Sequence, residues 1–131
     1  MKKIYTLSLI LLLSVKASIL FGQNAGDYRS IVSGSWFTPA NWETYDGVAW
    51  GPAVVAPTAV DGVITIQAGT TINYAADNIN LDQVVVDSTA TLTFFSALLT
   101  IENGPGNDME VAGTLEISGE TFIDGLGYSI S

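Results

Sequence analysis

From Val60 onward, hydrophobic and polar residues alternate in short runs that are separated by turn residues. The runs lie in "VITIQAGTTINY", "NLDQVVVDSTATLTF", "ALLTIENGPGNDMEVAGTLEI" and "SGETFIDG". Alternation over a few residues is typical of half-buried strands, and clusters of Gly, Asn and Asp between the runs are typical of turns. No stretch from residue 23 onward shows the periodicity of an amphipathic helix. The pattern therefore predicts an all-β fold.

The predicted strands repeat along the chain. The segments "IQAGTTIN", "VDSTATLT" and "VAGTLEIS" align, and their turn residues Gly69, Ala90 and Gly113 are 21 and then 23 residues apart. A period between about 20 and 50 residues is the signature of stacked repeats. We therefore predict a parallel β-helix (β-solenoid) over residues 62–131, in which each repeat forms one coil. An antiparallel β-sandwich is the alternative, because it also has short strands at regular spacing.

Alternate residues of each predicted strand should point into the interior of the β-helix. Side chains at equivalent positions of successive coils would then form columns. The predicted interior positions are Ile66, Ile72, Val86, Leu92, Val111, Leu115 and Ile117.

Residues 23–61 have little periodicity and contain the aromatic stretch "SGSWFTPANWETYDGVAW". We expect this part to be irregular, with one strand near residues 29–32. Repeat proteins need atypical terminal units over the ends of their core, and indole rings bury a large area. We therefore predict an aromatic cap before the first coil. The alternative is a carbohydrate-binding surface, for which the candidate residues are Trp36, Trp42, Tyr45 and Trp50; cap residues would be buried and binding residues open.

Residues 1–22 have the order of charged, apolar and small residues that marks a secretory signal peptide. "MKK" is basic, and the apolar run "IYTLSLILLLSV" is shorter than the roughly 20 residues of a membrane span. We expect cleavage near Gly22 and a protein that is secreted or held at the outer cell surface, without insertion in the membrane after cleavage. The chain has no cysteine, which argues against a lipid anchor.

Removal of the signal peptide makes the chain strongly acidic. Its three lysines lie in that segment, so Arg29 remains as the one basic residue against 13 acidic residues and the net charge is −12. Such a surface repels nucleic acid and anionic membranes. We therefore expect no nucleic-acid partner, and look for partners among extracellular glycans or surface proteins.

The absence of histidine and cysteine restricts the chemistry of the chain. It excludes a Ser-His-Asp triad, a Cys-His pair and a His-ligated zinc site. A polysaccharide lyase needs cationic groups near its substrate, and Arg29 lies outside the predicted coils. Glycosidases need only two carboxylates, but acidic residues on solvent-facing strands commonly serve solubility. We therefore expect no enzymatic activity and assign no catalytic or cofactor-binding residue.

One loop, "NGPGNDMEV" at residues 103–111, resembles the calcium-binding nonapeptide of repeat-in-toxin proteins. It occurs once, whereas that family completes its calcium site with neighbouring copies. Gly, Asn and Asp also favour an ordinary turn, and this is the interpretation that we favour. The candidate calcium ligands are Glu102, Asn107, Asp108 and Glu110, whose oxygen atoms are of the kind that Ca²⁺ prefers.

The stretch "SGSWFTPANW" and the following "PTAVDGVITIQAGTTINYAADNINLDQVVVDSTATLTF" resemble the opening of many secreted Bacteroidetes surface proteins. The shared pattern is Gly-x-Trp, a second Trp, Pro, Asp, a Val/Ile strand, a Gly-Thr turn, "Leu-x-Val" and "Ala-Thr-Leu-Thr". The matching positions are Gly34, Trp36, Trp42, Pro57, Asp61, Val63, Ile64, Ile66, Gly69, Thr70, Leu81, Val84, Val86, Ala90, Thr91 and Leu92. The chain is also similar, more distantly, to the eight-glycine domain of animal surface proteins.

This resemblance covers residues 33–117. It implies a right-handed parallel β-helix at the start of a large adhesin-like protein that is exported by type IX secretion. Because the chain stops at Ser131 without a sorting domain, we expect it to be the N-terminal piece of a longer protein. We therefore expect a non-catalytic structural or adhesion module at the cell surface. The alternatives are a carbohydrate-binding module and the N-terminal part of a polysaccharide-degrading β-helix enzyme.

Overall fold

A computed structural model describes residues 22–95, 98–118 and 122–124 of the chain. The predicted signal peptide, except for Gly22, lies outside the described residues. The described part is all-β, as predicted: it contains strands β1 to β13 and one short 3₁₀ helix, η1 (Pro39–Asn41). No helix within it is long and apolar enough to span a membrane.

Nine strands form three successive units of three strands each. The first unit consists of β5 (Ile64–Ile66), β6 (Thr71–Tyr74) and β7 (Asn78–Leu81). The second consists of β8 (Val84–Val86), β9 (Thr91–Phe94) and β10 (Leu98–Ile101). The third consists of β11 (Met109–Val111), β12 (Thr114–Ile117) and β13 (Phe122–Asp124). Each unit places its first strand in sheet A, its second in sheet B and its third in sheet C.

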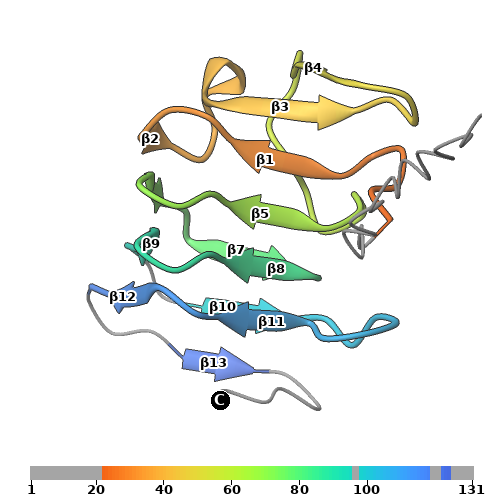
Figure 1. Cartoon of the computed structure of the whole chain (residues 1–131). Helices are drawn as coiled ribbons and strands as arrows, with labels where there is room; N and C mark the ends of the chain where they lie inside the picture. Colours follow the sequence, from red (N-terminus) through yellow and green to blue (C-terminus); the bar gives the residue numbers. More distant parts are fainter. Residues whose placement is uncertain (1–21, 96–97, 119–121, 125–131) are drawn as a thin grey trace, which may run out of the picture.

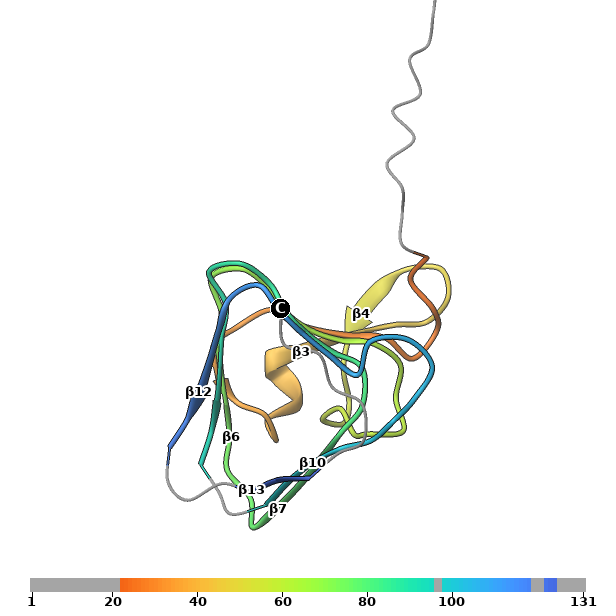
Figure 2. The same ribbon diagram turned by 90° about the horizontal axis from the view of Figure 1, so that it is seen from below.

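Equivalent strands of successive units pair in parallel in all three sheets. Figure 1 shows the strands of these units stacked as successive layers from β5 down to β13. Seen from below, the sheets form the sides of a roughly three-sided outline (Figure 2). An antiparallel sandwich, the alternative prediction, does not fit this part of the described chain, because its strand pairs are parallel.

The register of the repeat differs by one residue from the predicted spacing of the turn residues. Ile66 pairs with Val86, 20 residues later, as in the aligned segments, and Gly69 donates a 3.3 Å main-chain hydrogen bond to Thr89. Thr89, and not Ala90, is thus the counterpart of Gly69. Both have a positive φ, 80° at Gly69 and 68° at Thr89, so the backbone repeats although the residue type does not. The choice of Ala90 as the turn residue was wrong because it matched small residues.

The interior of the three units is apolar. Of the predicted interior residues, Ile66, Ile72, Val86 and Leu92 are fully buried, and Val111 and Leu115 are partly buried against the same core. Ile117 is a correction, since 44% of its surface is exposed. It pairs with Phe94 on one side, but among the described residues no strand covers β12 on the other.

The segment before the three units is more regular than predicted. It contains β1 (Tyr28–Ser30), β2 (Gly34–Ser35), β3 (Trp42–Tyr45) and β4 (Trp50–Pro52). β1 pairs in parallel with β5 and β2 with β6, whereas β3 and β4 continue sheet A in antiparallel fashion. β1 lies close to the one strand that was predicted, whereas β2 pairs only with the distant β6, so local periodicity does not reveal it.

Two of the three tryptophans close the N-terminal end of the core. Trp36 and Trp42 are 1% and 0% exposed and belong to the same buried cluster as the interior residues of the units. The Trp36 indole donates a 2.8 Å hydrogen bond to the carbonyl oxygen of Pro57, and its ring lies 4.7 Å from that of Tyr74. In Figures 1 and 2, β3 and η1 lie across this end of the three-sided outline.

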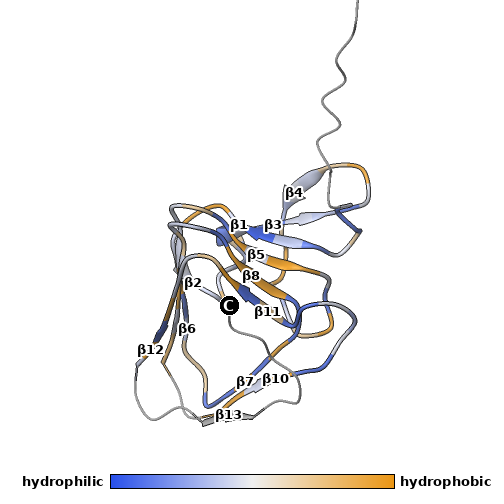
Figure 3. Cartoon of the chain, turned by 60° about the horizontal axis from the view of Figure 1, so that its bottom comes forward, coloured by the Kyte–Doolittle hydropathy of each residue, from blue (hydrophilic) through white to orange (hydrophobic). Residues whose placement is uncertain are grey.

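Hydropathy separates this end from the units below it. In Figure 3, β5 and β8 are coloured as largely hydrophobic, whereas β1 and β3 are hydrophilic. The contrast arises mainly from the charged residues Arg29 in β1 and Glu43 in β3. The buried side chains of the covering end include Trp36 and Trp42, whereas those of the units are mostly aliphatic, with Tyr74 and Phe94 as the aromatic members.

Candidate functional site

The outer face of sheet A carries a groove with a volume of about 690 Å³. Small-molecule sites commonly have volumes between about 300 and 1,000 Å³. Its lining comes from the N-terminal segment, from five strands of sheet A with the residues that flank them, and from the loop before β11. The lining residues are Gly22, Gln23, Asp27, Arg29, Trp50, Val63, Thr65, Gln67, Gln83, Val85, Pro105, Gly106, Asn107 and Glu110.

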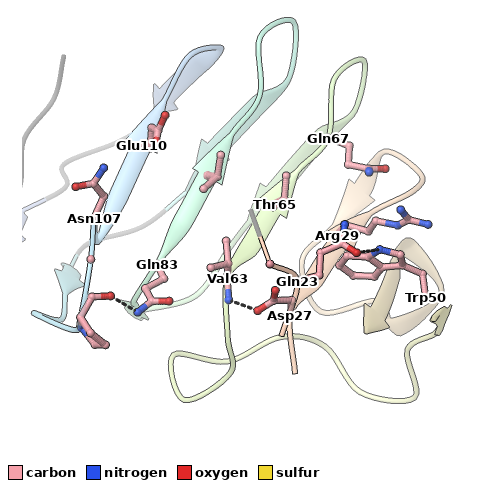
Figure 4. Close-up of a pocket in the computed structure, with 14 residues that line it drawn as sticks. Gln23, Asp27, Arg29, Trp50, Val63, Thr65, Gln67, Gln83, Asn107 and Glu110 are labelled. Carbon is pink, nitrogen blue, oxygen red and sulfur yellow. Dashed lines mark hydrogen bonds between the residues drawn. The ribbon is translucent and has the colours of Figure 1, made fainter. Parts of the chain in front are cut away.

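Strand register builds the floor of the groove. Arg29 of β1 pairs with Thr65 of β5, Thr65 pairs with Val85 of β8, and Val85 pairs with Glu110 of β11. Each is the middle residue of its strand, between neighbours that point to the core, so these four side chains face outward. With about 4.8 Å between neighbouring strands, the row extends over roughly 14 Å. Figure 4 shows Arg29, Thr65 and Glu110 along this row.

Arg29 and Trp50 form one end of the groove. The guanidinium carbon of Arg29 lies 4.4 Å from the centroid of the Trp50 ring, in a cation–π contact. The Trp50 indole N–H donates a 3.2 Å hydrogen bond to the amide oxygen of Gln23, and the Tyr45 ring lies 5.3 Å away. These contacts hold the partly exposed Trp50 ring in one orientation (Figure 4).

The positive charge of Arg29 is paired with the carboxylate of Glu43 at this end of the groove. Its Nε and Nη2 atoms donate hydrogen bonds of 2.7 and 2.5 Å to the same carboxylate oxygen of Glu43. Asp27 is buried, and its two oxygens accept main-chain hydrogen bonds from Val63 and Asn24. Glu43 is thus paired with Arg29 and Asp27 with the main chain, and Glu110 is the exposed acidic residue of the lining.

Amide side chains supply most of the polar lining. Gln23 and Asn107 are exposed, and Gln67 and Gln83 are partly exposed. The Gln83 amide donates a 2.6 Å hydrogen bond to the carbonyl oxygen of Pro105, which fixes the loop at the far end of the groove (Figure 4). The side-chain oxygen Oε1 of Gln83 takes part in no hydrogen bond with the described residues.

The four candidate calcium ligands fall into separate places. Asn107 and Glu110 line the groove, whereas Asp108 is buried and accepts a 3.0 Å hydrogen bond from the main-chain N–H of Gly104. Glu102 is exposed at the start of the same loop. Within the described ranges, no group of three acidic side chains comes together in a way that could hold a metal ion. Asp108 instead has the turn-forming role that we favoured.

Asp82 is a partly buried acidic residue beside the same loop. One of its carboxylate oxygens is inaccessible to solvent and has no hydrogen-bond partner. Burial raises the pKa of Asp82 above its ordinary value, and the nearby carboxylates of Asp108 and Glu102 raise it further. The side chain packs against the Cα of Gly104, so the turn of the loop creates this environment.

The four candidates for carbohydrate binding also separate. Trp36 and Trp42 are buried in the core, so their ring faces are not available to a ligand. Tyr45 and Trp50 are partly exposed and in contact, and Trp50 alone of the four lines the groove. The sequence did not identify Thr65, Val85 and Gln83. Outward positions that recur one repeat apart could have identified the first two.

In comparisons with protein-family models, with curated proteins and with solved structures, no match to the chain was found. The site is therefore interpreted from its own geometry.

Proposed function

We propose that this chain is an exported, non-catalytic structural module built as a parallel β-helix with an aromatic N-terminal cap. The observation that carries the proposal is the repeated order of the three units, each of which adds one parallel strand to sheets A, B and C. Connections between consecutive parallel strands are almost always right-handed, so we propose a right-handed coil.

The cap supports a role at the beginning of a stack. Repeat proteins protect the end of their core with an atypical unit, and here Trp36, Trp42 and the antiparallel strands β3 and β4 cover one end of the interior. Below it, each unit presents strand edges on which a further unit can pair. Stacked units of this kind give an extended and stiff surface, which suits an adhesin-like protein outside the cell.

The N-terminal sequence and the charge support an exterior location. We propose that residues 1–22 direct export, that type IX secretion carries the protein across the outer membrane, and that the acidic chain remains at the cell surface. A net charge of −12 in residues 23–131 keeps such a surface apart from nucleic acid and anionic lipids.

The test is the intact mass and location of the native protein in the cells that make it. We expect a species that begins at Gln23 and that protease added to whole cells removes. A protein that retains Met1 and stays protected inside the cell would contradict the export proposal. If the species is larger than this chain and releases reducing sugars from polysaccharides, the enzyme alternative replaces the non-catalytic module.

A further inference from the structure

We propose that the groove on the outer face of sheet A binds a neutral oligosaccharide. The proposal rests on the side chains that strand register brings together on this face. It does not depend on export or on an adhesin-like role. The binding experiments below and the test of export can therefore fail independently of each other.

The dimensions of the groove fit a short chain of sugar rings. The row from Arg29 to Glu110 crosses four strands and extends over roughly 14 Å. The groove volume of about 690 Å³ is larger than a single ion or a small metabolite needs. The Arg29–Trp50 pair closes one end of the row, and the loop at Pro105 bounds the other (Figure 4).

The polar lining matches hydroxyl groups, which both donate and accept hydrogen bonds. Side-chain amides have the same double capacity, and four of them surround the groove: Gln23, Gln67, Gln83 and Asn107. At the two ends, the Nη1 group of Arg29 can donate and the exposed carboxylate of Glu110 can accept. A polyol can satisfy both ends, whereas a ligand with only donors or only acceptors can satisfy one.

The apolar lining matches the C–H faces of sugar rings. Val85 lies in the floor, and Trp50 and Pro105 lie toward opposite ends. Trp50 is held by Arg29 and by its hydrogen bond to Gln23 before any ligand arrives. A side chain that is already ordered loses little conformational entropy on binding, which favours affinity.

Charge selects a neutral ligand over a charged one. The single cation, Arg29, is paired with Glu43, so an anion gains little from it and meets the acidic chain around it. A cation would gain from Glu110 but would meet Arg29 at the other end of the same row. Because the charged groups oppose each other along the groove, an uncharged ligand encounters no net repulsion.

Tryptophan fluorescence of the exported protein tests the proposal. Trp36 and Trp42 are buried, so a change in emission on ligand binding reports on Trp50. The neutral probes are cellohexaose, xylohexaose, mannohexaose and laminarihexaose, and the charged probes are polygalacturonate and polylysine. We expect a saturable change with at least one neutral probe, and expect Trp50→Phe to remove that change.

Substitutions locate the binding site, and isothermal titration calorimetry measures their effect so that an added tryptophan does not disturb the readout. Val85→Trp fills the floor, and Glu110→Gln removes an end group while keeping its size; we expect each to weaken binding about tenfold or more, which corresponds to about 1.4 kcal/mol. Glu116→Gln, on the outer face of sheet B, is the matched control and should bind as the unsubstituted protein does. The circular dichroism spectrum checks that each variant is folded.

Three results would overturn the proposal. One is the absence of any emission change with all four neutral probes at millimolar concentration. The second is binding that both Val85→Trp and Glu110→Gln leave unchanged. The third is binding confined to polygalacturonate or polylysine, which would make the groove a site for charged polymers.

Discussion

The indole N–H of Trp42 donates a 2.8 Å hydrogen bond to the main-chain carbonyl of Trp36, and the two rings meet edge to face with centroids 5.0 Å apart. Replacing Trp42 with Phe removes the donor and leaves a buried carbonyl unpaired, which we expect to lower the free energy of unfolding by about 2 kcal/mol. Trp42→Ala also opens a cavity and should cost about 4 kcal/mol. Urea unfolding followed by circular dichroism measures both losses.

The matched control for the cap is Trp50→Phe. Trp50 is partly exposed on the groove and lies outside the buried cluster. We expect this substitution to lower the free energy of unfolding by less than about 1 kcal/mol, in the range of most surface changes. Equal losses for Trp42→Ala and Trp50→Phe would show that Trp42 does not close the core.

Thr89 and Gly69 occupy equivalent corners, and we expect substitutions at these two positions to have opposite effects on stability. Thr89 is β-branched and adopts a φ of 68°, which glycine adopts without strain. We expect Thr89→Gly to raise the free energy of unfolding by about 1 kcal/mol and Gly69→Thr to lower it by about as much. The midpoint of urea unfolding gives both values. If Thr89→Gly destabilises the protein, the corner does not have this conformation.

Gly113 lies in the corner between β11 and β12, which is shorter than the corresponding corners of the first two units. This corner has no room for a residue larger than glycine. An added Cβ would overlap the main-chain carbonyl oxygens of Asp87 and Ala90 in the preceding unit, which stacking prevents from moving away. We therefore expect Gly113→Ala to lower the free energy of unfolding by about 2 kcal/mol. Gly51→Ala is the control, because nothing lies within 4 Å of its added Cβ. Similar melting temperatures for the two variants would contradict this close approach.

The raised pKa of Asp82 predicts that the stability of the protein depends on pH. Burial raises its pKa in the folded state, so the folded protein binds this proton more tightly than the unfolded chain does. Its contribution to stability therefore falls as pH rises from the ordinary pKa of an aspartate through the raised pKa. Asp82→Asn should remove this loss and raise the free energy of unfolding at pH 7. Urea unfolding measured from pH 4 to pH 7 gives the profile.

Asp46 is the control with the opposite sign. Hydrogen bonds from the main-chain N–H groups of Ala49 and Val48 lower the pKa of this exposed carboxyl. Its stabilising contribution is present above the ordinary pKa and is lost as pH falls through the lowered pKa. We expect Asp46→Asn to destabilise the protein at neutral pH. A stabilising effect of Asp46→Asn, or a destabilising one of Asp82→Asn, would contradict the assignments.

The sequence predicted the all-β class and much of the buried core, because alternation identifies the core-facing residues of each strand. Ile66, Ile72, Val86 and Leu92 follow this rule and are buried. It predicted one strand close to β1 but did not predict β2, since a strand of two residues forms only where a distant strand offers its edge. It also gave Ala90 as the turn residue in place of Thr89, because a left-handed backbone conformation at a threonine leaves no mark in composition.

The groove was even less accessible to sequence analysis. Its floor joins Arg29, Thr65, Val85 and Glu110, which are far apart in the chain and meet only through register. A one-residue error in register would turn these side chains to the core. The aromatic candidates illustrate the same difficulty. The three tryptophans lie in one stretch of the sequence, but two of them are buried and the third lines the groove.

The central claim is that successive units stack in parallel, with the second unit offset from the first by 20 residues. Nuclear Overhauser contacts in the isotopically labelled exported protein test it most directly. We predict main-chain contacts between Ile66 and Val86, between Ile72 and Leu92 and between Ile79 and Leu99, one pair in each sheet. Close Hα–Hα contacts between antiparallel neighbours, such as β5 with β6, would contradict the parallel β-helix.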